Sequence, residues 1–162
     1  MSNEIKRDYY DNGNICSEEY YLDGKPHRED GPAKIAYNQN GNIKIKEYYI
    51  NGKRHREDGP ALIAYGNINC EVYYINDELH RENGPAWIEY DANGNISTRV
   101  YYLNGKDFGK FIKNRTININ KDLIIKEENN INKLKLMKII ANENKQQEYV
   151  DLIDSKIISL TL

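Results

Sequence analysis

A motif of fourteen residues that occurs three times is the feature that most constrains the fold of this chain. Each copy begins with paired tyrosines, passes through a turn-forming segment and ends in His-Arg-Glu-Asp/Asn-Gly-Pro-Ala. The copies occupy residues 20–33, 48–61 and 73–86. They begin 28 and then 25 residues apart, and a truncated fourth copy starts 28 residues later, at 101–106. Such a period is typical of a supersecondary unit stacked on copies of itself, so the sequence predicts a repeat region over 1–106.

Alternating apolar residues follow each motif and predict two strands per repeat. After Gly-Pro, apolar side chains recur at every second position, as in Ala33, Ile35 and Tyr37, which is the period of a strand with one apolar face. An Asn-Gly turn, such as Asn40-Gly41, then leads into a return strand that ends at the next tyrosine pair. The turn between the second and third copies is shortened. We expect about seven locally connected strands between residues 5 and 103, which form an antiparallel meander.

The segment 107–162 lacks the repeat and has a different pattern. Residues 110–113 are compatible with one helical turn, and 115–120 alternate as a short strand would. Beyond residue 130, two sets of apolar residues recur at helical spacing and predict two amphipathic helices. The predicted fold is mainly β, a single sheet of stacked hairpins in an antiparallel meander, with an α-helical C-terminal cap that covers an open end or face.

Composition argues against several classes of function. The net charge of −2 provides no nucleic-acid-binding signature, and we expect no nucleic-acid partner. No run of about 18 apolar residues exists, and the first residues lack the apolar core of a secretory signal. We therefore expect an intracellular, cytoplasmic protein that does not bind membranes.

The block at residues 47–65, Glu-Tyr-Tyr-Ile-Asn-Gly-Lys-Arg-His-Arg-Glu-Asp-Gly-Pro-Ala-Leu-Ile-Ala-Tyr, resembles MORN repeats. It is more similar to the MORN-like variant with a His-Arg-Glu-Asp-Gly-Pro-Ala signature, which is found in large DNA viruses, some bacteria and phages. The resemblance covers residues 5–106 and implies an elongated sheet of hairpins that serves protein interaction or scaffolding, in the host cell if the protein is viral. The chain departs from MORN repeats by the inserted Arg-Glu-Asp and Pro, so the lipid binding of other MORN proteins is not carried over. Residues 107–162 resemble no family.

The three histidines of the chain occupy one repeat position, each followed by Arg and Glu, and this edge is the first candidate site. Equivalent histidines two strands apart stand roughly 10 Å from one another, whereas ligands of one zinc ion lie about 2 Å from it, so they cannot share a metal. We expect no metal, cofactor or catalytic residue. Two interpretations of this edge remain open. It is a charge ladder with a structural role alone, or it is a charge ladder that also contacts a partner. Its residues are His27, Arg28, Glu29, His55, Arg56, Glu57, His80, Arg81 and Glu82.

Four aromatic residues form the second candidate site, provided that the C-terminal helices leave them uncovered. Aromatic anchors dominate the energetics of many interfaces, so we predict one aromatic face built from Tyr48, Tyr73, Trp87 and Tyr101. The predicted function is non-enzymatic protein–protein interaction or scaffolding, with a homodimer as one possible assembly. The alternative prediction is an antitoxin-like or viral inhibitor that sequesters a host enzyme or a small signalling molecule.

Overall fold

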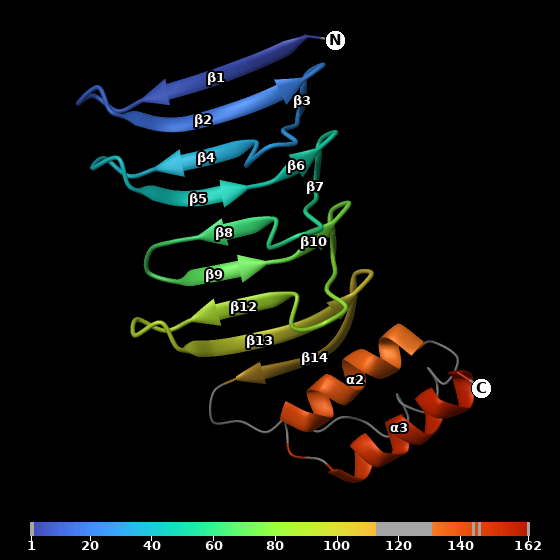
Figure 1. Ribbon diagram of the computed structural model, residues 1–162. Coiled ribbons are helices and arrows are strands. Elements are labelled where there is room, and N and C mark those ends of the chain that lie inside the picture. Colours follow the sequence, from blue (N-terminus) through green and yellow to red (C-terminus); the bar gives the residue numbers. More distant parts are fainter. Residues whose placement is uncertain (1, 113–130, 144, 146, 162) are drawn as a thin grey trace.

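A long antiparallel sheet dominates the computed structural model, which describes residues 2–112, 131–143, 145 and 147–161. Strands follow one another along the sheet in chain order, so the predicted mainly β antiparallel meander is confirmed (Figure 1). The strands on this path are β1 (Asn3–Tyr9), β2 (Ile15–Leu22), β4 (Lys34–Tyr37), β5 (Ile43–Glu47), β8 (Leu62–Ala64), β9 (Asn69–Val72), β12 (Trp87–Tyr90), β13 (Ile96–Leu103) and β14 (Lys106–Ile112).

The predicted Asn-Gly turns close three of the long hairpins, β1–β2, β4–β5 and β12–β13. In each turn the glycine has a φ angle near +80°, which Gly13, Gly41 and Gly94 adopt without strain. The register shifts by one residue just before each turn, as at Ala36/Tyr37. The fourth hairpin, β8–β9, has the shortened turn that the sequence indicates.

A second, smaller hairpin in each repeat was not predicted. It begins at the second tyrosine of the pair and turns through two residues that both have positive φ, as in Asn51 (51°) and Gly52 (86°). This is the geometry of the type I′ turn, whose twist matches that of the flanking strands. The short strands are β3 (Lys25–Pro26), which pairs with β2, and the separate pairs β6 (Tyr49–Ile50) with β7 (Lys53–Arg54) and β10 (Tyr74–Ile75) with β11 (Glu78–Leu79).

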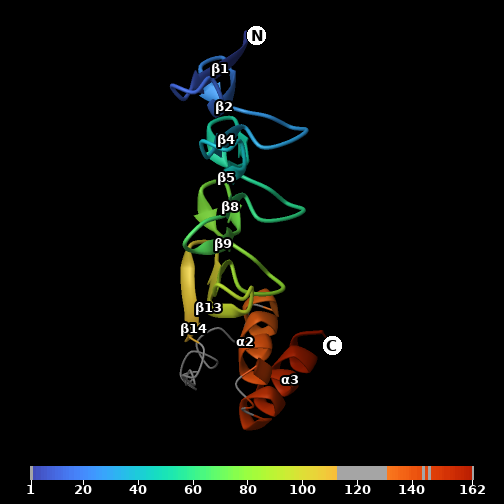
Figure 2. The same ribbon diagram turned by 90° about the vertical axis from the view of Figure 1, so that its left-hand side faces the viewer.

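The alanine that ends each motif closes the connection back onto the sheet. The backbone N–H of the first tyrosine donates to the carbonyl of this alanine at 2.7 Å in all three copies. The alanine side chain is fully buried at this crossing, so a larger residue there would have to displace its neighbours. The residues are Ala33, Ala61 and Ala86. The connections β2–β4, β5–β8 and β9–β12 consequently protrude from the same face (Figure 2).

Strand number and one local element differ from the sequence prediction. Eight long strands lie between residues 3 and 103, one more than the approximate number expected. The helical turn suggested at 110–113 is wrong for 110–112, which belong to β14 and pair with β13. The sheet thus continues to Ile112, past the predicted boundary at 106. The suggested strand at 115–120 lies outside the described residues.

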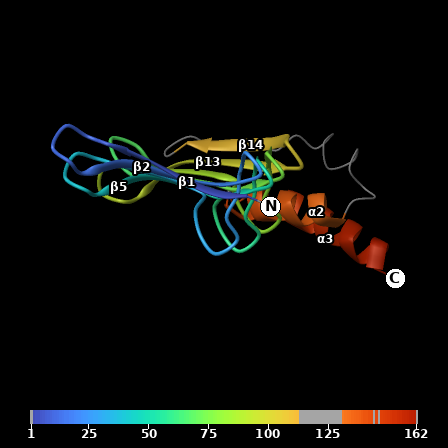
Figure 3. The ribbon, with the colours of Figure 1, turned by 90° about the horizontal axis from the view of Figure 1, so that it is seen from above.

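Two C-terminal helices confirm the predicted α-helical segment. Helix α2 (Ile131–Glu143) and helix α3 (Gln147–Thr161) pack against each other and are joined by an ion pair of 2.6 Å between Lys138 and Asp154. They lie beside the last hairpin, on the side from which the connections protrude (Figures 2 and 3). A cluster of buried apolar residues forms there, from Tyr101, Leu103, Leu134, Leu136, Met137, Ile140, Ala141, Val150 and Ile153.

Candidate interaction site on the repeat edge

An arginine in each motif stacks on a tyrosine of the same motif. The intervening small hairpin and loop fold back over the sheet and bring the guanidinium onto the ring face, where cation–π attraction is strongest. Distances from Cζ to the ring centroid are 4.1, 4.1 and 3.9 Å in Arg28–Tyr20, Arg56–Tyr48 and Arg81–Tyr73. Two arginines of the predicted edge, Arg56 and Arg81, therefore cover two tyrosines of the predicted aromatic face, Tyr48 and Tyr73.

The glycine three residues after each arginine leaves room for the stacked guanidinium. A Cβ added to Gly59 would lie 3.0 Å from Cζ of Arg56, and the corresponding nearest distances are 3.3 Å at Gly31 and 3.4 Å at Gly84. None of these three glycines has a positive φ angle. The Gly of Gly-Pro-Ala is thus explained by a side-chain contact rather than by backbone conformation.

Aspartates hold two of the three arginines in place. The Nε–H of Arg28 donates to Asp30 and that of Arg56 donates to Asp58, both at 2.8 Å. These hydrogen bonds lower the pKa of both aspartates, and the first raises the pKa of Arg28. In the third copy Asn83 replaces the aspartate.

Each histidine of the predicted edge contacts the small hairpin of the next repeat. The backbone N–H of Asn51 donates to Nδ1 of His27 at 3.0 Å. Nδ1 of His55 lies 3.1 Å from the side-chain oxygen of Asn76. Nδ1 of His80 lies 2.7 Å from the side-chain oxygen of Asn104 and 3.2 Å from its backbone nitrogen. All three asparagines have positive φ and open the type I′ turns. The histidines therefore tie successive repeats together. The sequence indicates a turn-forming segment in each motif, but it does not show that this segment is a hairpin in contact with the preceding histidine.

The glutamates of the first two motifs point outward, as do the aspartates that bind the arginines. The side chains of Glu29 and Glu57 are each 85 % exposed. Their nearest cationic group among the described ion pairs is the imidazole of the same motif, at 3.7 and 3.6 Å, which is charged only when protonated. The third glutamate, Glu82, accepts a hydrogen bond of 3.1 Å from the side-chain amide of Asn132, at the start of α2.

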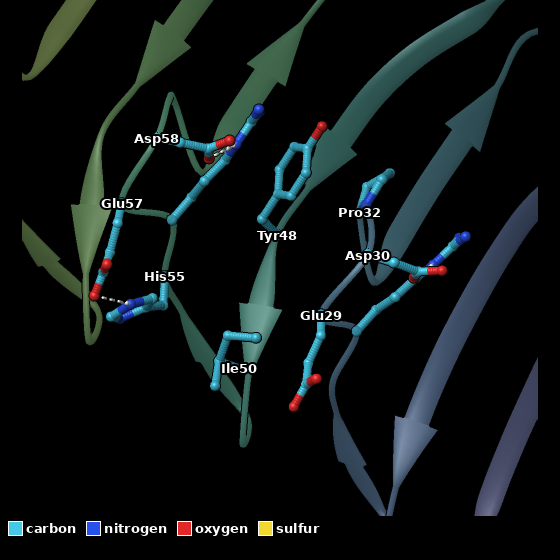
Figure 4. Close-up of a pocket in the computed structure, with 11 residues that line it drawn as sticks. Glu29, Asp30, Pro32, Tyr48, Ile50, His55, Glu57 and Asp58 are labelled. Carbon is cyan, nitrogen blue, oxygen red and sulfur yellow. Dashed lines mark hydrogen bonds and ion pairs between the residues drawn. The ribbon is translucent and has the colours of Figure 1, made fainter.

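Successive loops enclose a row of equivalent grooves. The groove between the first and second loops has a volume of about 490 Å³, and the next has about 670 Å³. A third, of about 480 Å³, lies between β1 and the first loop. Figure 4 shows Tyr48 and Ile50 between two loops, one carrying Glu29 and the other Glu57. In the neighbouring grooves the same floor positions are occupied by Tyr73 and Ile75 and by Tyr20 and Leu22.

The fourth equivalent position is closed by the C-terminal helices. Tyr101 is fully buried beneath them, and its hydroxyl donates to Glu143 at the end of α2. Burial and this hydrogen bond raise the pKa of Tyr101. Arg99 also pairs with Glu143, at 3.4 Å. Tyr101 was predicted as an interface residue only if the helices left it uncovered, and that condition is not met because the helices cover this end of the sheet.

Trp87 lies on the other face of the sheet. Its cross-strand partners are Val72 and Val100, and Val100 precedes Tyr101 in the regular strand β13. Successive side chains of a strand point to opposite faces, so Trp87 and Tyr101 cannot belong to one face. The predicted aromatic face is thus divided: Tyr48 and Tyr73 line grooves, Tyr101 is buried and Trp87 faces away.

The described residues contain no group of three or more His, Cys, Asp or Glu side chains arranged to hold a metal ion. Within the same part of the chain, no helix is both long and apolar enough to cross a membrane.

Comparison with known families found no family model that matches the chain, and comparison with curated proteins found no match either.

Proposed function

We propose that this protein is a non-enzymatic interaction module of the MORN-like class, which binds another protein through the row of grooves on its repeat edge. The observation that carries the proposal is the repetition of one groove, with a tyrosine and an aliphatic residue at its floor and a glutamate at its mouth. A partner that contacts one groove meets the same chemistry at the next, so that several weak contacts add up in one interface.

The different structural roles of the residues within the motif support this proposal. Arginine, glycine and alanine have structural contacts that hold the connection on the sheet, and histidine ties it to the next repeat. Glu29 and Glu57 are exposed at the groove mouths. Their only nearby cationic group among the described ion pairs is the imidazole of the same motif, so most of each carboxylate remains available for recognition.

The test is affinity capture from cells that express the protein, with captured proteins quantified by mass spectrometry. The bait carries Glu29→Arg and Glu57→Arg, because changing His55 or Arg56 instead would alter the fold. The matched control is Glu78→Arg with Glu148→Arg, since both of these residues are exposed and neither lines a groove. We expect at least one protein that is captured by the wild type and the control but lost with the groove variant.

A captured set that is the same for all three baits would refute the proposal. Glu29→Arg and Glu57→Arg, tested one at a time, distinguish a scaffold from the alternative of a one-target inhibitor. A scaffold that uses the whole row loses binding in steps as each groove is changed, whereas an inhibitor with one contact patch loses it when that patch alone is changed.

A further inference from the structure

The linings of all three grooves carry more negative than positive charge. With neutral histidines, the groove between the first two loops has two arginines against four carboxylates. The groove that follows has two arginines against three carboxylates, and the one beside β1 has one arginine against three. The arginines of the first two loops are already bonded to aspartates. Among the residues that the structure describes, Glu29 and Glu57 have only the imidazole of their own motif nearby, at 3.7 and 3.6 Å, and their side chains are 85 % exposed, so a cationic group can reach them.

The chain itself shows what this lining accepts. At the fourth position, apolar side chains of α2 cover Tyr101 and Leu103, and the amide of Asn132 donates to Glu82. The same combination in the open grooves requires an aliphatic stem over the tyrosine and isoleucine and an N–H donor at the glutamate. Lysine and arginine side chains have this composition.

The spacing of the grooves determines which backbone conformation of a bound segment can place one cationic side chain in each groove. Neighbouring grooves are two strands apart, which corresponds to about 9.4–9.8 Å. A polyproline II segment has three residues per turn and rises about 9.3 Å over three residues, so every third side chain points the same way at nearly this spacing. Seven residues of an α-helix rise about 10.5 Å. Helical side chains seven residues apart are therefore displaced from the groove positions by about 1.4–2.2 Å after two grooves. Aromatic-lined grooves are also a known type of receptor for polyproline II segments.

We propose that the row of grooves binds a polyproline II segment of the partner protein that carries lysine or arginine at every third residue, one cation per groove. This inference rests on the proposed function and specifies its partner. The glutamates bind the cationic heads, and Leu22, Ile50 and Ile75 contact the stems.

The test titrates the full chain with two peptides and follows binding by NMR chemical shifts of its backbone amides. One peptide repeats Lys-Pro-Pro four times, and the other has four lysines separated by three prolines, which breaks the three-residue period at the same charge. We expect the first to bind about fivefold more tightly or better, with shifts at the groove residues. Glu29→Gln with Glu57→Gln should weaken it by about tenfold, because each exposed charge contact contributes a few-fold. Glu78→Gln with Glu148→Gln should change the dissociation constant by less than about twofold.

Equal affinity for the two peptides, or no loss in the groove variant, would overturn the inference. Tighter binding of a helical peptide with lysines seven residues apart would also overturn it. If neither proline-rich peptide binds while capture still identifies a partner that depends on Glu29 and Glu57, the polyproline II assignment fails and the proposed function stands. If peptide binding is found but capture shows no partner that depends on the grooves, the proposed function fails instead.

Discussion

The guanidinium carbon of Arg56 lies 4.1 Å from the centroid of the Tyr48 ring, with the whole of the second small hairpin between them in the sequence. The same guanidinium donates to Asp58 and to the carbonyl of Pro60. One side chain thus fastens the start of the motif, on the sheet, to its end, where the chain returns to the next strand. Arg56 thus covers one face of the Tyr48 ring, and Tyr48 also lies at the floor of a groove.

This relationship predicts a graded response at position 56. Arg56→Ala should lower the free energy of unfolding by about 1–2 kcal/mol, because a cation–π contact and a charged hydrogen bond are lost together. Arg56→Lys should cost less, since it retains the charge but not the planar stack. Urea unfolding followed by circular dichroism measures both. Lys44→Ala, at an exposed position on β5, is the control and should stay within about 0.5 kcal/mol of the wild type. Equal values for Arg56→Ala and the control would show that the stack does not stabilise the fold.

The glycine beside the guanidinium provides an independent check of the same contact. Gly59→Ala should destabilise the protein by about 1 kcal/mol, because the new Cβ lies 3.0 Å from Arg56 and displaces it. The cost should disappear in the Arg56→Ala background, where the obstacle is gone. Gly84→Ala, with a nearest distance of 3.4 Å, should have the smaller effect. The full double-mutant cycle is measured by chemical denaturation, and a cost that persists without the arginine would point to the backbone instead.

Tyr101 should determine the response of the protein to alkali. Its pKa is raised in the folded state, so its contribution to stability is complete below the ordinary tyrosine pKa of about 10 and is lost as the pH rises above that value. Tyr101→Phe should lower the free energy of unfolding at neutral pH by about 1–3 kcal/mol through the lost hydrogen bond to Glu143.

The Tyr101→Phe variant should also lose less stability than the wild type between about pH 9 and 11. Tyr65→Phe, at an exposed tyrosine, is the control. Thermal unfolding across this pH range distinguishes the variants, and parallel pH profiles for Tyr101→Phe and wild type would contradict the assignment.

Acid should weaken the arginine–aspartate pairs of the first two loops. The pKa values of Asp30 and Asp58 are lowered in the folded state, so their contribution is present above the ordinary aspartate pKa of about 3.9 and disappears as the pH falls below it. The double variant Asp30→Asn with Asp58→Asn should lose less thermal stability than the wild type between about pH 5 and 2. Because both pairs are at the surface, 1 M salt should shrink this difference. A difference that is unchanged by salt would rule out the ion pairs as its cause.

Much of the fold follows directly from the sequence because it is local. Alternation at period two places strands, and Asn-Gly closes hairpins between strands that are neighbours in the chain, so the meander needs no information from distant residues. The two amphipathic helices are equally visible as a period. The small hairpins were missed because their strands are two residues long, too short to show an alternation, although the turn dipeptide at Asn51-Gly52 carries the signal.

Less of the candidate site could be predicted. The sequence places histidine, arginine and glutamate on one recurring edge, but adjacency in the chain does not say which of them point inward. The positive-φ turn at Asn51 brings His27 into contact with the next repeat, and the return of the loop sets Arg56 on Tyr48. Glu57 is left exposed, so three adjacent residue types have three different roles.

By itself, therefore, the sequence determined the repeat, the meander and the presence of C-terminal helices, because short-range periodicity and turn chemistry specify each of them. Only the tertiary structure decided which surfaces remain accessible. Tyr101 occupies the same repeat position as Tyr48, yet the helices bury the first while the second lines an open groove. Nothing local distinguishes these tyrosines: what separates them is which distant segment packs above them, and this depends on the burial of apolar area over the whole chain.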